Sequence, residues 1–203
     1  MFNRIYHFLK GPSPLHPSVC NGRLSPRAFR RFDRKDLSQC LELYALNEPG
    51  RFPEGVAQQY KKSLSEEHSY HLVTESGGQI IASGGISYHT RADWVVLSFG
   101  LVRPSHQGQG LGTALLLSRL ALLKPGRFSY HIFIFAVEES FGFYRRFGFR
   151  DIQPWRDDHG DQHPSGHLLL TGSEIRRCRE LLSSRGIVLP QAEEEIPLRV
   201  EAV

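Results

Sequence analysis

A glycine-rich run between an apolar stretch and a leucine-rich stretch constrains the fold more than any other part of the chain. Gly108, Gly110 and Gly112 alternate with other residues directly after the apolar, β-branched residues 94–102. Residues 110–123 then have the apolar spacing of a helix. The pattern predicts a strand, a tight turn and a helix in succession. Such a turn exposes backbone N–H groups at the positive end of the helix dipole, which favours a bound phosphate.

The spacing of the run does not match two common phosphate-binding motifs. It lacks the Lys-Ser/Thr ending of a P-loop, and it is not the G-x-x-G close of a dinucleotide fingerprint. It resembles the Q/R-x-x-G-x-G/A signature of the GNAT superfamily of N-acetyltransferases, here written Gln107-Gly108-Gln109-Gly110-Leu111-Gly112 and followed by Thr113. The resemblance implies that these loop amides bind the pyrophosphate of acetyl-coenzyme A. A glycine-rich turn without a ligand is the alternative.

A second segment, residues 141–149, resembles the end of the penultimate GNAT helix, because it has an aromatic-Tyr-x-x-x-Gly-Phe pattern. Gly148 is predicted to close a short helix in the left-handed C′ position, with Phe149 folded back onto Phe143 or Tyr144. The resemblance implies that Tyr144 points to the coenzyme sulfur as general acid and that Phe143 and Tyr144 contact the coenzyme. An aromatic helix face packed in the core is the alternative.

The strand before the glycine run supplies further expected contacts. The resemblance implies that the backbones of Leu101 and Val102 pair with the pantetheine arm as an added strand would, with Arg103 next to them. It also implies that a backbone N–H holds the thioester oxygen where two parallel strands splay apart.

The chain departs from the family pattern at two places. Residues 94–102 contain no carboxylate, although many family members have a glutamate there, and Val137 stands where many have an asparagine that bonds the pantetheine. Either a water chain deprotonates the amine or a base comes from elsewhere, the candidates being Glu138, Glu139, His89 and Asp93. The two glutamates are more simply interpreted as first-turn acids that complement a helix dipole.

The length of 203 residues suits one domain with tails, and 40% apolar residues are sufficient for a core. The three cysteines are widely spread and form no C-x-x-C pair, which argues against a disulfide framework or a structural zinc site. We therefore expect a reducing, cytoplasmic environment. No apolar run has the length of a transmembrane helix, so no membrane partner is expected.

The net charge of +4 is concentrated near the start of the chain. The first 32 residues contain no acid and six basic residues, namely Arg4, Lys10, Arg23, Arg27, Arg30 and Arg31. The remainder is nearly balanced, and a modest positive field also suits an anionic coenzyme. Nucleic-acid binding is therefore not expected.

The elements predicted from residue 27 onward alternate as in an α/β domain. The expected strands are 28–32, 70–74, 80–88, 94–102, 128–135, 149–153 and 167–170, and the expected helices are 33–46, 54–64, 110–123, 138–147 and 173–184. Short turns favour antiparallel pairing before residue 94, whereas the unit 94–135 requires a right-handed crossover between parallel strands. This predicts an α/β GNAT fold: a mixed, mostly antiparallel sheet of six to seven strands, with a splayed parallel pair at its centre and helices on both faces.

The predicted organisation has three parts. Residues 1–26 form a basic, proline-rich arm, residues 27–171 the GNAT domain, and residues 172–203 a helix with an acidic tail. A cluster of histidines and aspartates lies late in the domain, at Asp157, Asp158, His159, Asp161, His163 and His167. Its spacing matches no known metal site, and Gly160, Pro164 and Gly166 favour a solvated loop, so no metal is expected.

These features predict transfer of an acetyl group from acetyl-coenzyme A to a primary amine of a small molecule or a peptide. The alternative is a GNAT-fold module that binds acyl-coenzyme A without turnover, as a sensor or an interaction domain. The expected partners are acetyl-coenzyme A and an amine acceptor, and the expected assembly is a monomer or a homodimer.

Overall fold

The protein is described by a computed structural model that covers residues 24–48, 52, 55–66, 69–88, 93–126, 129–156 and 160–190. Most of the predicted basic arm and of the acidic tail lies outside these residues. Leu24, only 8% exposed, already belongs to the main apolar core. The predicted boundaries at residues 26 and 171 stay predictions.

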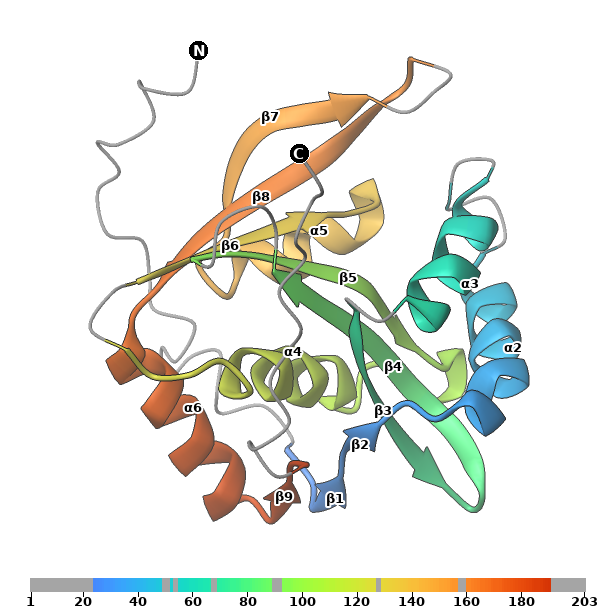
Figure 1. The fold of residues 1–203 in the computed structure, drawn as a ribbon, viewed down its shortest axis with the longest axis horizontal. Helices are drawn as coiled ribbons and strands as arrows, with labels where there is room; N and C mark the ends of the chain where they lie inside the picture. The colour runs from blue at the N-terminus through green and yellow to red at the C-terminus, as the bar shows by residue number, and fades with distance from the viewer. Residues whose placement is uncertain are drawn as a thin grey trace.

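A mixed sheet of seven strands forms the centre of the described molecule, in the order β2-β3-β4-β5-β6-β8-β7 (Figure 1). Its strands are β2 (Arg30–Arg31), β3 (Tyr70–Ser76), β4 (Gln79–Tyr88), β5 (Trp94–Val102), β6 (Tyr130–Phe135), β7 (Arg150–Arg156) and β8 (Gln162–Leu170). Only β5 and β6 are parallel, and every other neighbouring pair is antiparallel. The predicted mixed sheet with a central parallel pair is therefore confirmed.

The first predicted strand, residues 28–32, is wrong in detail because the segment changes its partner halfway. β1 (Arg27–Ala28) pairs in parallel with β9 (Ile187–Val188), whereas β2 pairs with β3. Between them Phe29 is buried, and its N–H donates to the carbonyl of Val188 at 2.8 Å. A pairing with a segment about 160 residues away has no local sequence signal.

Helices cover both faces of the sheet, as predicted. They are α2 (Leu37–Asn47), α3 (Val56–Ser65), α4 (Leu111–Ala121), α5 (Glu138–Arg145) and α6 (Gly172–Ser184), with short 3-10 turns η1 (Arg34–Asp36) and η2 (Pro104–His106). Figure 1 shows α2 and α3 together on one side, and α4 and α6 together on the other. α4 packs against β4, β5 and α6, and α2 packs against β4 and β5 from the opposite face.

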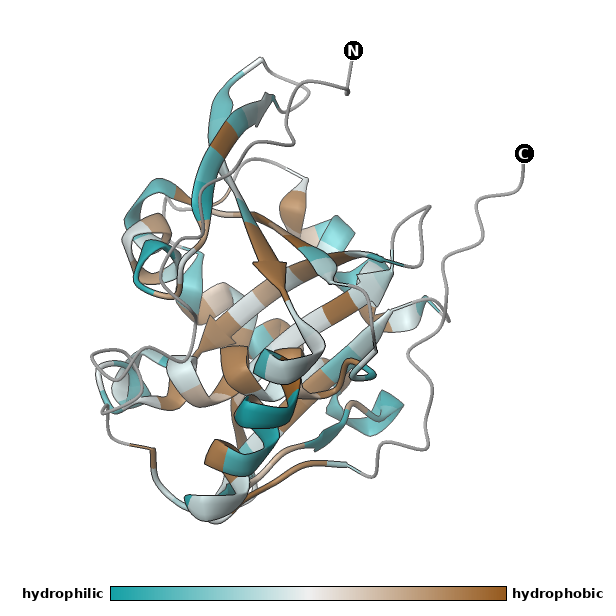
Figure 2. Ribbon diagram, turned by 90° about the vertical axis from the view of Figure 1, so that its left-hand side faces the viewer, coloured by the Kyte–Doolittle hydropathy of each residue, from teal (hydrophilic) through white to brown (hydrophobic). Residues whose placement is uncertain are grey.

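α4 is the most deeply buried helix, with every residue from Ala114 to Ala121 buried. Figure 2 shows hydrophobic residues concentrated on the central strands and the helix beside them. Ile175, Cys178 and Leu182 of α6 complete the same core. The glycine turn at the start of α4 is therefore held on a rigid element.

The predicted loop between the strands 149–153 and 167–170 is wrong for residues 162–166, which belong to β8. Pro164 fits inside this strand because the register of β7 and β8 shifts opposite it, where no N–H is needed for the ladder. Asp157, Asp158 and His159 lie outside the described residues. Among the residues that are described, no three metal-binding side chains cluster together.

Candidate functional site

The glycine turn has the predicted geometry. Gly108 and Gly110 have φ angles of +71° and +84°, left-handed values that residues with a β-carbon rarely adopt. Gly110 is the N-cap of α4, so the N–H groups of Leu111, Gly112 and Thr113 occupy a first turn that has no intrahelical acceptors. The turn therefore presents backbone donors at the positive end of a helix.

Two glutamine side chains of the motif brace this turn from within. Gln107 Nε2 donates to Asn47 Oδ1 at 3.2 Å and to the Val102 carbonyl at 3.0 Å. Gln109 Nε2 donates to the Ser105 carbonyl at 3.0 Å. The turn thus keeps its shape through side chains, and its backbone stays available to a ligand.

Arg103 anchors the same segment. Its guanidinium is mostly buried and donates to Glu42 Oε1 at 3.0 Å, while its backbone N–H donates to the Ile81 carbonyl at 2.8 Å. These contacts fix the end of β5 against β4 and α2. Arg103 acts in this structure as an anchor of the predicted binding segment.

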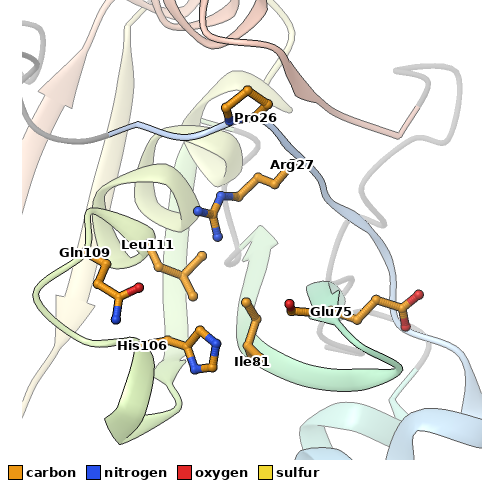
Figure 3. Close-up of a pocket in the computed structure, with 8 residues that line it drawn as sticks. Pro26, Arg27, Glu75, Ile81, His106, Gln109 and Leu111 are labelled. Carbon is orange, nitrogen blue, oxygen red and sulfur yellow. The ribbon is translucent and has the colours of Figure 1, made fainter.

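A hollow of about 330 Å³ lies beside the turn, on the side of β4 (Figure 3). It is lined by Pro26, Arg27, Glu75, Ser76, Ile81, His106, Gln109 and Leu111. Arg27 and Glu75 contribute opposite charges to its wall, so the lining is not uniformly positive. The backbone N–H groups in the first turn of α4 therefore match the predicted phosphate site better than this hollow does.

The central parallel strands separate beside the turn. β5 and β6 pair only from Trp94 with His131 to Leu97 with Ile134, while β5 continues to Val102. A bulge interrupts the pairing of β5 with β4 in the same place, and Phe99 adopts a φ of +46° there. In the described part of the chain no strand pairs with this edge of β5 beyond Leu97. An extended ligand could add to this edge as a strand does.

α5 carries Tyr144 to the open edge of β5. The Tyr144 hydroxyl oxygen lies 3.1 Å from the position that a β-carbon would take on Gly100. On the preceding residue, the Phe143 ring lies 3.7 Å from the equivalent position on Gly112, in the first turn of α4. Of the two aromatic residues predicted to contact the coenzyme, Tyr144 therefore borders the splayed strands and Phe143 borders the glycine turn.

The end of α5 is closed as predicted. Gly148 has a φ of +85°, its N–H donates to the Arg145 carbonyl at 3.0 Å, and the Phe149 N–H donates to the Tyr144 carbonyl at 3.3 Å. These are the two hydrogen bonds of a Schellman motif. The Phe149 ring packs edge-on against the Tyr144 ring, with the two ring centroids 5.6 Å apart. On the other side the centroid of the Phe143 ring lies 5.1 Å from that of Tyr144. Tyr144 is thus fixed from two sides.

The candidate bases are not gathered at this edge. Glu138 and Glu139 are exposed in the first turn of α5, roughly 7–9 Å along the helix axis from Tyr144. Asp93 precedes the opposite end of β5, roughly 16 Å along the strand from Ser98. His89 lies outside the described residues.

Arg119 is a functional candidate that the sequence pattern did not reveal. It lies within α4 at 2% exposure, and its Nη1 atom is 3.3 Å from the carbonyl oxygens of both Gly85 and Ser98. Burial lowers the pKa of its guanidinium, and the interaction with the Tyr144 side chain acts in the opposite direction. The available signal was an arginine in the middle of an otherwise apolar helix.

Histidines occupy the other face of the sheet, on β3, β6 and β8. His71 on β3 is 3% exposed, and its ring and the Ser98 hydroxyl both lie close over Gly85. Burial lowers the pKa of His71 to about 4, with the Arg119 charge acting in the same direction. His131 Nδ1 and His167 Nε2 are 3.0 Å apart on β6 and β8. Two members of the predicted histidine and aspartate cluster, His163 and His167, thus lie on the sheet.

The sequence profile of the acetyltransferase (GNAT) family matches residues 37–149, more than half of the chain. Together with the mixed sheet and its splayed parallel pair, this match shows that the chain belongs to the GNAT acetyltransferase family, and it confirms the resemblance found in the sequence. No curated protein sequence matches the chain significantly.

Solved structures share the fold at low sequence identity. An acetyltransferase from Streptococcus agalactiae aligns with a TM-score of 0.59 and 17% identity, over 70% of this chain and 97% of the other. The ribosomal-protein-S18-alanine N-acetyltransferase of Escherichia coli gives 0.54 and 16% identity, over 70% and 93%. An aminoglycoside 6′-N-acetyltransferase in complex with coenzyme A gives 0.54 and 14% identity, over 71% and 96%.

Proposed function

We propose that this protein transfers an acetyl group from acetyl-coenzyme A to a primary amine of a small molecule or a peptide, by direct attack and with Tyr144 as general acid. The observation that supports this most strongly is the placement of the Tyr144 hydroxyl beside the open edge of β5, with the neighbouring Phe143 ring beside the glycine-rich first turn of α4 and its backbone donors. Membership of the GNAT family and the coenzyme A complex of a similar fold support the donor.

The coenzyme would bind along the segment from β5 to α4. The pyrophosphate fits the backbone amides of residues 107–113, because the left-handed Gly108 and Gly110 leave no side chains over them. The pantetheine arm would pair with the backbones of Leu101 and Val102, next to Arg103. Phe143 would border the arm from α5.

The reaction then needs three events at the splayed strands. The amine nitrogen attacks the thioester carbon, the C–S bond breaks, and the Tyr144 hydroxyl gives its proton to the departing sulfur. A backbone N–H of β5 would hold the carbonyl oxygen as negative charge develops on it. Since no carboxylate lies on β5, we propose that water removes the amine proton.

The acceptor is proposed to be an amine rather than an alcohol or a thiol. Two proteins of similar fold are named for amine acceptors, the alanine of ribosomal protein S18 and an aminoglycoside. The exposed Glu138 and Glu139 remain the nearest carboxylates on α5. If water is the base, the acid limb of kcat/KM follows the pKa of the amine substrate, and Glu138→Gln or Glu139→Gln leaves that limb unchanged.

The direct test is free-thiol release from acetyl-coenzyme A in the presence of a panel of small amines and peptides. Amine-dependent thiol release, with the acetylated amine identified by mass spectrometry, supports the proposal. Binding of acetyl-coenzyme A without thiol release across the panel would instead support a non-catalytic acyl-coenzyme A module. The missing strand carboxylate is the feature that favours this second function.

A further inference from the structure

Arg119 is an unusual residue for the centre of a protein core. It is the largest of the fully buried side chains in the described molecule, and it lies on the most apolar helix. No carboxylate among the described residues pairs with it, and Tyr144 is the one side chain that raises its pKa. A buried charge without a counter-ion is costly, and the hydrogen bonds to the Gly85 and Ser98 carbonyls offset only part of that cost.

The sheet is shaped to receive this guanidinium. A β-carbon on Gly84 would lie 3.2 Å from Arg119 Cζ, Nε and Nη1, and one on Gly100 would lie 3.1 Å from Arg119 Nη2. Glycines at these two positions leave the room that the side chain occupies. The guanidinium thus reaches the bulge of β5, where the strand leaves β6.

At the bulge, Arg119 meets Tyr144. Its Nη2 atom and the Tyr144 hydroxyl oxygen lie at equal distances, 3.1 Å, from the position that a β-carbon would take on Gly100, and Tyr144 opposes the lowering of the Arg119 pKa by burial. A guanidinium has only donors. In a contact between these two groups the Tyr144 oxygen is therefore the acceptor, which leaves the Tyr144 proton free to point elsewhere.

We propose that Arg119 is a positioning residue for Tyr144: it fixes the phenolic oxygen as an acceptor, directs the phenolic proton to the departing sulfur, and stabilises the phenolate that remains. The inference rests on the proposed acetyl transfer with Tyr144 as the acid. When the C–S bond breaks, its electron pair stays on sulfur and takes the Tyr144 proton, and solvent returns a proton to the phenolate. A fixed cation in a dry site stabilises that transient anion without reorganisation.

Steady-state kinetics of a double-mutant cycle test this inference. Arg119→Met keeps an unbranched side chain about as long as the aliphatic stem of arginine, removes the guanidinium group, and is compatible with folding, since apolar residues often replace buried ions at little cost in stability. We expect it to lower kcat about 10- to 100-fold and to leave KM for acetyl-coenzyme A within about twofold. In a Tyr144→Phe background the same change should lower kcat no further, because the group through which Arg119 acts is gone.

Two other variants separate positioning from a structural effect. Arg119→Lys keeps the charge and the donor character, so it should recover part of the kcat lost in Arg119→Met. Arg179 is the matched control, because it also donates to backbone carbonyls, those of Ala121 at 2.7 Å and Leu123 at 2.9 Å, but does so from α6. Arg179→Met should leave kcat unchanged while thermal melting reports any loss of stability.

The outcomes also separate this inference from the proposed function. Equal losses of kcat from Arg119→Met in the parent and in the Tyr144→Phe background would overturn the positioning role. So would an unchanged kcat in Arg119→Met. A Tyr144→Phe enzyme with normal turnover would overturn the acid itself, whatever Arg119 does. If Arg119→Met does not fold, the same cycle is measured with Arg119→Lys. An equal loss of kcat from Arg119→Lys in the parent and in the Tyr144→Phe background would likewise overturn the positioning role.

Discussion

At the scale of single residues, the site depends on a few groups held at short range. Tyr144 lies between Phe143 and Phe149, and its hydroxyl reaches the bulge of β5 beside Arg119. A thiol leaves most easily when an acid within hydrogen-bond reach protonates it. The position of one hydroxyl therefore carries the proposed chemistry.

Replacing this hydroxyl tests the acid role. Tyr144→Phe should reduce kcat by about 10²- to 10³-fold, the range of general acid catalysis, and should leave the affinity for acetyl-coenzyme A nearly unchanged because the ring still packs. Tyr130→Phe is the control, since it removes a hydroxyl that donates to the Lys124 carbonyl at 3.1 Å, away from the glycine turn. Near-normal turnover of Tyr144→Phe would contradict the assignment.

At the scale of elements, two glycine-dependent helix ends place the site. Gly110 starts α4 and Gly148 closes α5, both in left-handed conformations. Both were predictable, because a left-handed residue at a helix end is a local requirement that glycine meets best. Gly142 differs, since it lies inside α5 and a β-carbon on it would touch nothing within 4 Å.

The two glycines of α5 should respond to alanine in opposite ways. Gly148→Ala should lower the free energy of unfolding by roughly 1–2 kcal/mol, because a β-carbon is unfavourable at positive φ. Gly142→Ala should raise it by roughly 0.5–1 kcal/mol, since alanine is the better helix former. Urea unfolding monitored by circular dichroism measures both. A stabilised Gly148→Ala would show that this helix end does not need a left-handed residue.

Sequence patterns predicted the features that depend on neighbouring residues. The turn at Gly110, the Schellman end at Gly148 and the full extent of β5 were all obtained from local spacing. Local spacing did not predict the change of strand partner at Phe29 or the continuation of β8 through Pro164, because both depend on strands that are distant in sequence. Arg119 was missed for the same reason, since its partners lie on β4, β5 and α5.

At the scale of the whole molecule, two histidines couple stability to pH. Burial lowers the pKa of His71 and of His167 to about 4, below the value of about 6.5 in an unfolded chain. The folded protein therefore binds fewer protons than the unfolded chain between these two pH values. Stability should be complete above pH 6.5 and should fall as the pH decreases toward 4.

The effect of His71 is large enough to measure. For His71 alone, the loss of stability between pH 7.5 and pH 5 is of the order of 2 kcal/mol. His71→Gln should remove this part of the pH dependence, and His167→Gln should remove its own contribution. Denaturant unfolding at a series of pH values provides the measurement. An unchanged pH dependence in His71→Gln would show that His71 is not held neutral by burial.

The central claim is that the glycine turn at the start of α4 binds the pyrophosphate of acetyl-coenzyme A through its backbone. Isothermal titration calorimetry of acetyl-coenzyme A into the parent protein and into Gly110→Asp tests it most directly. The control is Gly77→Asp, which places the same side chain on another left-handed glycine, with φ of +58°, in the turn between β3 and β4. We predict that the parent and Gly77→Asp bind alike, and that Gly110→Asp binds at least about tenfold more weakly because a carboxylate meets the phosphates. Equal affinities in all three proteins would contradict the claim.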